Sequence, residues 1–386
     1  MENALAIVAG DFMPTGGMDR ANLALAGYLA KSGRTVELVT HRVEPRLAAS
    51  VGVRVHHVAK PLGSYFLGQG RLDHLGRRVA RRVALAGGHC IVNGANCLWP
   101  DVNWVHYVHA AYQPQQASSS LRRLKGLIER PINLRRERLA LQSARIVICN
   151  SFKTQRDVVQ LLGVDSSRTC VIYYGIDAEE FRPIDKVERN RVRNQLGLSM
   201  ARPTVCFVGA LGDRRKGFDT LFAAWKSLCR ESAWDAQLVV IGAGAELEAW
   251  RSRAAAAGLN DHCRFLGFRN DVPRLIPAFD LLVAPTRYEA YGLGVQEALA
   301  CGIPAMVSAD AGVAEQYPED LRDLLLSDPE DDVDLAARLR TWRKSVPEHL
   351  QRIAPLTQRI RNRSWDDMSR EILDQVDSPV ASPLTT

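Results

Sequence analysis

The chain has 386 residues, of which 46% are hydrophobic and 24% charged, and this length and composition are typical of a globular protein with two domains. No stretch stays apolar for about 18 residues, and no basic segment precedes the short apolar run near the N-terminus. We therefore expect neither a transmembrane helix nor a signal peptide. The charge is uneven, because residues 1–180 contain 23 Lys and Arg against 14 Asp and Glu, whereas the remainder contains 27 against 29.

Strand and helix signals alternate through the first half of the chain. Apolar, β-rich runs occur at 4–10, 35–41, 90–95, 103–109, 145–151 and 169–174. Between the first two, residues 18–31 have apolar side chains three and four apart, as in an amphipathic helix, and Gly33 follows where that helix should end. This alternation predicts a parallel sheet with helices on both faces.

A charged span without strand signals, EEFRPIDKVERNRVRNQLG, separates this half from a second alternating region. There the apolar runs are 204–210, 237–242, 264–268, 279–285 and 305–309. We therefore predict two α/β domains, 1–183 and 184–360. A final helix over 361–376 is predicted from SWDDMSREILDQV with an N-cap at Ser364, and the tail 377–386 is expected to be disordered.

Two loops at strand ends have the residues of an anion site, because open parallel sheets bind ligands beyond the carboxyl ends of their strands. In GDFMPTGGMDRAN, Gly16 and Gly17 allow close backbone approach at the start of a helix. In FVGALGDRRKGFDTL, the basic residues Arg214, Arg215 and Lys216 follow a strand, although the spacing is not that of a P-loop.

The third loop is YEAYGLGVQEALACGIP, in which Glu289 lies before a predicted helix and Glu297 lies within it. The N–H groups at 292–294 would form an anion-binding helix end, and an acidic side chain there suits ribose hydroxyls. A glycosidase would instead need the two carboxyl groups about 5–10 Å apart across one bond. The neighbouring helix end favours nucleotide-sugar binding over hydrolysis.

These segments, in this order, resemble the family 4 retaining glycosyltransferases of GT-B fold. The E-x7-E motif of that family matches Glu289 and Glu297, with EAYGL and EALACGIP around them. GGMDRANLALAGYLAKSGRTVELVT, ICNSFKTQRDV, YYGIDAEEFRP, FVGALGDRRKGFDTL, GFRNDVPRLIPAFDLLVAPT and SWDDMSREIL resemble its other segments. The resemblance implies two Rossmann-like α/β domains facing a central cleft, with the last helix returning to the N-terminal domain. That domain would bind the acceptor, and the C-terminal domain the nucleotide-sugar donor.

By position, the resemblance implies that Glu297 binds the donor ribose, Glu289 contacts hydroxyls of the donor sugar, and Lys216 stabilises the leaving diphosphate in place of a metal ion. Phe268 and Arg269 would lie against the base. Backbone around three further residues would face the sugar and diphosphate: Tyr291, Gly292 and Leu293.

In the N-terminal domain, Gly16 and Gly17 would close over the phosphates, and His109 in VHYVHAAY resembles a histidine near the donor sugar. One position departs from the family pattern, because Ala210 follows the strand glycine where the family usually has Arg. Arg214 or Arg215 would have to substitute for that cation from the same loop.

The predicted reaction is transfer of a sugar from a nucleotide-diphosphate sugar to an acceptor hydroxyl with retention, through an oxocarbenium-like transition state. Domain closure would position the acceptor and exclude water. UDP is favoured by family frequency. The alternatives are a sugar-nucleotide epimerase of the same architecture and a non-catalytic nucleotide-sugar-binding subunit, which Ala210 favours.

The eight cysteines are scattered without a CxxC pair, which argues against a zinc site or a disulfide framework and fits a reducing cytoplasm. We expect no cofactor and no metal, since the resemblance implies metal-independent chemistry. The basic N-terminal half predicts weak association with an anionic membrane and a lipid-linked or polysaccharide acceptor. The protein would be cytoplasmic, and peripheral on the inner face of the membrane. Nucleic acid is not expected, since no recognition module is visible. The basic clusters are Arg77, Arg78, Arg81 and Arg82, and Arg122, Arg123, Lys125, Arg130, Arg135, Arg136 and Arg138.

Overall fold

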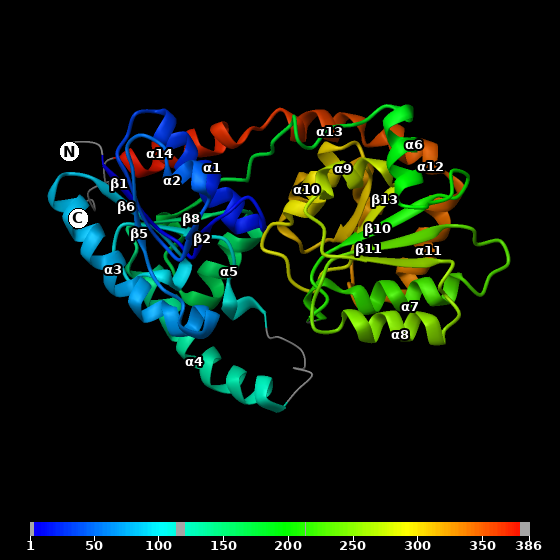
Figure 1. Cartoon of the computed structure of the whole chain (residues 1–386), viewed down its shortest axis with the longest axis horizontal. Coiled ribbons are helices and arrows are strands. Elements are labelled where there is room, and N and C mark those ends of the chain that lie inside the picture. The colour runs from blue at the N-terminus through cyan, green and yellow to red at the C-terminus, as the bar shows by residue number, and fades with distance from the viewer. Residues whose placement is uncertain (1–3, 113–119, 213, 379–386) are drawn as a thin grey trace. The chain divides into compact units, whose positions relative to one another are not determined.

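A computed structural model describes residues 4–112, 120–212 and 214–378, without the side chains of 120–128. Two compact α/β units divide between Gly175 and Ile176 (Figure 1). This position precedes the predicted 183/184, because Ile176 and Phe181 are buried in the core of the second unit. Most of the tail predicted to be disordered, from 379 onward, lies outside the described residues, as do the side chains of Arg122, Arg123 and Lys125.

The first unit contains a seven-stranded parallel sheet in the order β5-β3-β1-β6-β7-β8-β9. In β1, Leu5 pairs with Val36 of β3 on one side and with His89 of β6 on the other. The strands are β1 (Leu5–Val8), β3 (Val36–Thr40), β5 (Val53–His57), β6 (His89–Asn93), β7 (Val102–Val105), β8 (Ile146–Cys149) and β9 (Thr169–Val171). A small parallel pair, β2 (Asp11–Phe12) with β4 (Arg42–Val43), follows the carboxyl ends of β1 and β3.

Helices cover both faces of this sheet (Figure 1). They are α1 (Gly17–Lys31), α2 (Pro45–Ala48), α3 (Tyr65–Leu85), α4 (Ser120–Ser143), α5 (Phe152–Leu162) and α14 (Trp365–Asp377). Local signals set their ends: the Ser151 side chain accepts a hydrogen bond from the N–H of Thr154 at 3.0 Å and caps α5. Although it ends the described chain, α14 packs on α1, where Asp377 forms an ion pair with Arg34 at 2.6 Å.

The second unit contains a six-stranded parallel sheet in the order β12-β11-β10-β13-β14-β15. The strands are β10 (Thr204–Val208), β11 (Gln237–Ile241), β12 (Cys263–Gly267), β13 (Leu281–Ala284), β14 (Ala305–Ser308) and β15 (Leu325–Leu326). The helices are α6 (Lys186–Gln195), α7 (Phe218–Leu228), α8 (Leu247–Ala256), α9 (Val272–Leu275), α10 (Leu293–Ala300), α11 (Asp332–Lys344), α12 (Val346–Arg352) and α13 (Ala354–Arg361).

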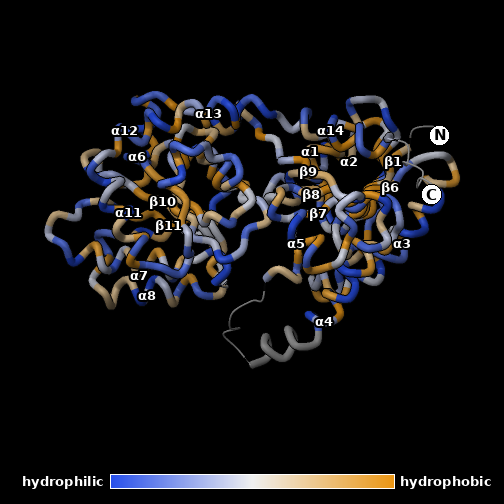
Figure 2. The backbone as a smooth tube through the Cα atoms, turned by 180° about the vertical axis from the view of Figure 1, so that it is seen from behind, coloured by the Kyte–Doolittle hydropathy of each residue, from blue (hydrophilic) through white to orange (hydrophobic). Residues whose placement is uncertain are grey.

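In both units the hydrophobic residues concentrate on the strands and on the inner faces of the helices, as the hydropathy colouring in Figure 2 shows. Trp104 in the first unit and Trp225 and Trp342 in the second are fully buried. Burial of a large apolar side chain contributes about 1.5–3 kcal/mol to stability. None of the helices in the described part of the chain is long and apolar enough to cross a membrane.

Candidate functional site

The loop between β10 and α7 is fixed directly against the segment that follows β13. Arg214–Lys216 form a single 3₁₀ turn, and Gly217 then adopts a left-handed conformation with φ of 70° as the N-cap of α7. A Cβ atom at Gly217 would lie 1.7 Å from the carbonyl oxygen of Pro285. Only glycine therefore allows this approach, which brings the basic turn to the residues preceding Glu289.

Two basic side chains of this turn meet the carboxylate of Glu289. The Lys216 ammonium forms an ion pair with Oε2 of Glu289, and Nη1 of Arg215 lies 3.9 Å from the same oxygen. Arg215 also donates to the carbonyl of Tyr288 at 3.3 Å. All three charged side chains are largely buried, with 16–22% of each exposed. Two cations facing one carboxylate leave a net positive charge, which suits a bound anion.

Arg214 points elsewhere. Its Nε lies 3.6 Å from Asp219, and the side chain is 52% exposed. Of the two residues predicted as substitutes for a cation at Ala210, Arg215 is therefore the one close to Glu289 and Lys216.

Arg287, which the sequence analysis did not single out, connects the β10–α7 loop to the segment that follows β13. Its guanidinium donates to Asp219 at 2.8 Å, to Glu330 at 2.7 Å and to the carbonyl of Arg214 at 2.6 Å. Its backbone N–H donates to the carbonyl of Arg215 at 2.8 Å. Burial lowers the pKa of Arg287, but hydrogen bonds to the two carboxylates more than offset this, so its pKa lies above the ordinary value. A permanent cation thus ties the turn to the end of β13.

The N-terminus of α10 completes the arrangement. Gly292 is its N-cap with φ of 116°, and a Cβ atom there would lie 2.8 Å from Val313. Tyr291 and Leu293 beside it are buried. A pocket at the carboxyl ends of β10, β13 and β14 is lined by Lys216, Glu289, Gly292 and Gly294 among other residues. The first N–H groups of a helix have no partner within the helix, so an anion can bind at this end.

Glu297 lies on the second turn of α10 and is 7% exposed. Burial, and secondly the charge of Glu297, raise the pKa of the Cys301 thiol to about 12. Phe268 and Arg269 follow β12, two strands from β10. The Phe268 ring is 65% exposed, and Arg269 forms an ion pair with Asp271 at 2.6 Å. These residues lie, like the pocket, beyond the carboxyl ends of the strands, which we call the ligand edge of the sheet. They do not line the pocket.

In the first unit, Gly16 is the N-cap of α1 and Gly17 its first residue, followed by Asp19 in the first turn. His109 begins the 3₁₀ turn His109–Ala111, and its side chain is 51% exposed. His106, by contrast, is buried beside Tyr174, and burial lowers its pKa to about 3. We interpret His106 as a packed, neutral residue.

Glu137 on α4, also missed from the sequence, holds His109 in place. Its carboxylate is 1% exposed and accepts from the N–H of His109 at 2.8 Å, from Nδ1 of His109 at 2.9 Å and from the N–H of Ala110 at 3.1 Å. Because an ionised carboxylate only accepts hydrogen bonds, Nδ1 of His109 donates to Glu137, and this contact fixes the orientation of the imidazole ring. The acidic residue in the basic stretch RRERL was the available signal.

All cysteines are free, and no cluster of three or more His, Cys, Asp or Glu suited to a metal occurs among residues 4–112, 120–212 and 214–378.

Comparisons with known proteins agree with this arrangement. Residues 188–357 match the model of the glycosyl transferases group 1, and residues 15–180 match that of glycosyltransferase family 4. A D-inositol 3-phosphate glycosyltransferase from Salinispora tropica is 28% identical over 96% of this chain and 82% of its own.

Two solved structures show the same fold. WaaG, a glycosyltransferase involved in lipopolysaccharide biosynthesis, superimposes with a TM-score of 0.77 at 18% identity, over 97% of this chain and all of its own. HepE from Anabaena, in complex with UDP-glucose, superimposes with a TM-score of 0.72 at 19% identity, over 97% of this chain and all of its own. The predicted α/β class with two Rossmann-like domains of GT-B type is confirmed.

Proposed function

The chain belongs to the family 4 glycosyltransferases, and we propose that it moves a sugar from a nucleotide-diphosphate donor to an acceptor hydroxyl with retention at the anomeric carbon. The acceptor would be a saccharide or a lipid-linked saccharide in polysaccharide or glycoconjugate biosynthesis. The observation that carries the proposal is the pocket in which Lys216, Glu289 and the N-terminus of α10 meet.

Departure of the diphosphate is the step for which this pocket is suited. Lys216 and Arg215 would turn from Glu289 to the phosphate oxygens, and the α10 N–H groups would add further donors, so that charge developing on the leaving group is stabilised. Glu289, released from its ion pair, would accept hydrogen bonds from the donor sugar. Glu297 would hold the ribose. We assign no protein nucleophile and no metal or other cofactor.

UDP-sugar is our favoured donor, supported by the UDP-glucose bound to the structurally similar HepE. The exposed Phe268 ring, with Arg269 beside it, would contact the base. From the first unit, Gly16 and Gly17 would contact the phosphates and His109 the donor sugar.

The test is substitution in the pocket. Lys216→Ala and Glu297→Ala should each lose at least about a hundredfold in transfer rate, because the loss of one preorganised charged group costs this much in comparable sites. Lys226→Ala, on the exposed face of α7, is the matched control and should transfer normally. Thermal melts should show all three folded. Full transfer by either pocket variant would refute the assignment.

Product analysis with donor alone separates the alternatives. An epimerase would convert the donor without an acceptor, and a binding subunit would take up the donor but transfer to no acceptor in a panel. Retention is tested by NMR of the new glycosidic bond, which should keep the anomeric configuration of the donor.

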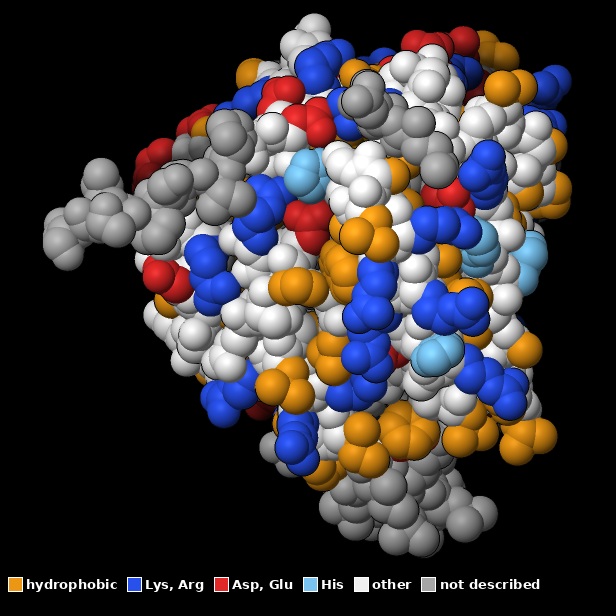
Figure 3. Space-filling model, turned by 90° about the vertical axis from the view of Figure 1, so that its left-hand side faces the viewer, with side chains coloured by type: hydrophobic (Ala, Val, Ile, Leu, Met, Phe, Trp, Pro, Cys, Tyr) orange, Lys and Arg blue, Asp and Glu red, His pale blue; other side chains and the backbone are white. Residues whose placement is uncertain are grey.

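The helix α3 supports association with an anionic membrane. Its exposed face carries Leu67, Arg71, His74, Arg78, Arg81 and Leu85, spaced three and four apart. Of the cluster predicted there, Arg77 and Arg82 form ion pairs with the buried carboxylates of Asp73 and Glu37, at 2.9 and 2.8 Å. Figure 3 shows this side of the first unit, where Lys and Arg side chains gather with hydrophobic ones between them.

We propose that this face rests on the cytoplasmic surface of a membrane containing anionic lipid. Wild type should sediment with vesicles of phosphatidylcholine and phosphatidylglycerol, and less so in high salt. Charge reversal at Arg71, Arg78 and Arg81 should abolish this. Reversal at Lys226, Arg251 and Lys344, which are exposed in the second unit, is the control with equal charge change. Equal binding by both triple variants would refute the α3 surface.

A further inference from the structure

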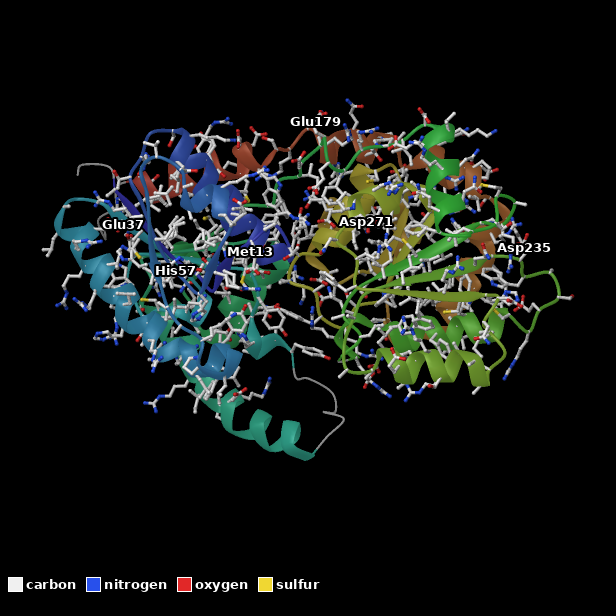
Figure 4. All side chains as sticks on the ribbon, viewed as in Figure 1. Met13, Glu37, His57, Glu179, Asp235 and Asp271 are labelled. Carbon is white, nitrogen blue, oxygen red and sulfur yellow. The ribbon has the colours of Figure 1, made fainter. Side chains whose placement is uncertain are left out.

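A second group of charged side chains lies at the ligand edge of the sheet in the first unit and has no role in the donor site. Three neighbouring strands, in the order β5-β3-β1, are followed by Lys60, Arg42 and Asp11. Met13, just after β2, and His57, the last residue of β5, mark this edge in Figure 4. Tyr65, the first residue of α3, joins the group. The strand order therefore gathers four residues that are up to 54 positions apart.

Asp11 is the buried anchor of the cluster. Its side chain is 1% exposed and accepts from Nε of Arg42 at 2.9 Å, from Nη2 of Arg42 at 2.5 Å and from the Tyr65 hydroxyl. Nη2 of Arg42 also lies 3.2 Å from the Tyr65 oxygen. One carboxylate thus fixes both a guanidinium and a phenol ring, and fixed geometry lowers the entropy lost when a ligand binds.

The anchored groups remain accessible. The Arg42 side chain is 53% exposed and Tyr65 is 48% exposed. None of the hydrogen bonds described for Arg42 uses its Nη1, which retains two N–H donors. Lys60 places its ammonium 3.8 Å from the centre of the Tyr65 ring, and no carboxylate in the described part of the chain forms an ion pair with it.

Arg42 and Lys60 are the cations of this cluster, and the hydrogen bond from Arg42 to Asp11 holds the pKa of Arg42 above its ordinary value. Asp11 offsets one of them, and Asp19, whose pKa burial and the charge of Asp11 raise to about 6, offsets the other above that pH. Asp11 is buried, whereas the Arg42 guanidinium remains accessible to a ligand. A purely structural ion pair between Asp11 and Arg42 would need neither Lys60 nor a half-exposed aromatic ring.

We propose that Arg42, Lys60 and Tyr65 form an acceptor subsite that recognises an anionic group, a phosphate or a carboxylate, on a saccharide or polyol. The inference rests on the proposed transfer reaction and names the acceptor class. The fixed guanidinium binds two oxygens of the anion, Lys60 supplies a second charge, and the tyrosine ring packs against the carbon skeleton.

Matched acceptors test the subsite. Transfer rates are measured for acceptor pairs that differ only in a phosphate group, such as a monosaccharide and its phosphate. Wild type should prefer the phosphorylated member at least about tenfold in kcat/KM, since a charge-assisted hydrogen bond contributes about that factor. Lys60→Gln should remove most of the preference through KM, and should leave the unphosphorylated member and donor binding unchanged.

Arg42→Gln should remove the preference more completely, but it also leaves the buried carboxylate of Asp11 without its cationic partner. Asp11→Asn with Arg42→Gln is therefore measured beside it. The control is Arg54→Gln, because Arg54 is 63% exposed and pairs with another buried carboxylate, that of Glu37, at 3.4 Å. Arg54→Gln should keep the preference. An equal preference in wild type and Lys60→Gln would overturn the subsite while leaving transfer intact.

A further experiment distinguishes a soluble acceptor phosphate from a lipid-linked one. The same sugar phosphate is offered free in solution and linked to an alkyl chain in detergent, and the better acceptor identifies a soluble or a lipid-linked phosphate. If no acceptor in the panel is used, calorimetry with the same phosphates decides. Binding that Lys60→Gln weakens about tenfold would support the anion subsite even without transfer. Absence of binding would overturn it.

Discussion

The ligand edges of the two parallel sheets are built in different ways. In the second unit the edge around the pocket is closely packed: Gly217 approaches the Pro285 carbonyl, Gly292 approaches the Val313 side chain, and Arg215, Lys216 and Glu289 are largely buried. In the first unit, long side chains such as Arg42 and Tyr65 are about half exposed around a single buried carboxylate. Close packing fixes one geometry, as the binding of one donor class requires. Half-exposed side chains, by contrast, can change conformation to suit the acceptor.

The largest effect should follow from a substitution that pushes the basic turn away from the segment that follows β13. In Gly217→Ala the new Cβ would overlap the Pro285 carbonyl, so the basic turn must move. We expect the free energy of unfolding to fall by more than about 3 kcal/mol and donor binding to be lost. Gly87→Ala is the control, because Gly87 also has a positive φ, 78°, but nothing within 4 Å of its Cβ position, and it should cost about 1–2 kcal/mol. Equal losses in denaturant melts would contradict the packing argument.

The second prediction concerns which arginine replaces the cation expected at Ala210. Arg215→Ala should lower the transfer rate about a hundredfold, because Arg215 lies beside Lys216 and Glu289. Arg214→Ala should change it by less than about threefold, because Arg214 is half exposed and faces Asp219. Steady-state kinetics on both variants decides, and the reverse ranking would assign the role to Arg214.

Glu137 provides a test of positioning in the first unit. Glu137→Gln loses the charge that orients the His109 imidazole, and kcat should fall about tenfold with donor affinity unchanged. If Glu137 acts through His109, the substitution should have little further effect in a His109→Ala background. Additive losses in this double-mutant cycle would show that Glu137 acts through the fold alone.

The smallest effect concerns Asp19 and pH. The folded-state pKa of Asp19, about 6, lies above the ordinary value of 3.8, so Asp19 favours folding below pH 4, and this contribution is lost as the pH rises through 6. Asp19→Asn should therefore be more stable than wild type at pH 8, by about 1 kcal/mol once partial exposure is taken into account, and the two should converge near pH 4. Urea melts at both pH values measure the difference. A constant difference would exclude this titration.

The sequence predicted the alternation of strands and helices well, because each buried parallel strand is a short apolar run. The strands β2, β4, β5 and β15 were missed, since they are two residues long or, as in β5, partly exposed. The family resemblance also placed Glu289 and Lys216 in one donor site, and in the structure the two side chains form an ion pair.

Other contacts could not be predicted from the sequence, because they join residues that are far apart in the chain. Arg287 contacts Asp219, 68 residues away, and His109 contacts Glu137, 28 residues away, and no local periodicity reports such pairs. The grouping of Lys60, Arg42 and Asp11 depends on the strand order β5-β3-β1, which chain order does not reveal.

The central claim is that Lys216 and its neighbours bind the diphosphate of the donor, and calorimetry tests it most directly. UDP, GDP and ADP are titrated into wild type and Lys216→Ala, each beside its nucleoside without phosphates. We predict that the tightest nucleoside diphosphate, UDP, binds at least about tenfold more weakly to the variant, whereas uridine binds both proteins alike. Equal UDP affinity in the two proteins, or an equal loss for UDP and uridine, would contradict the account.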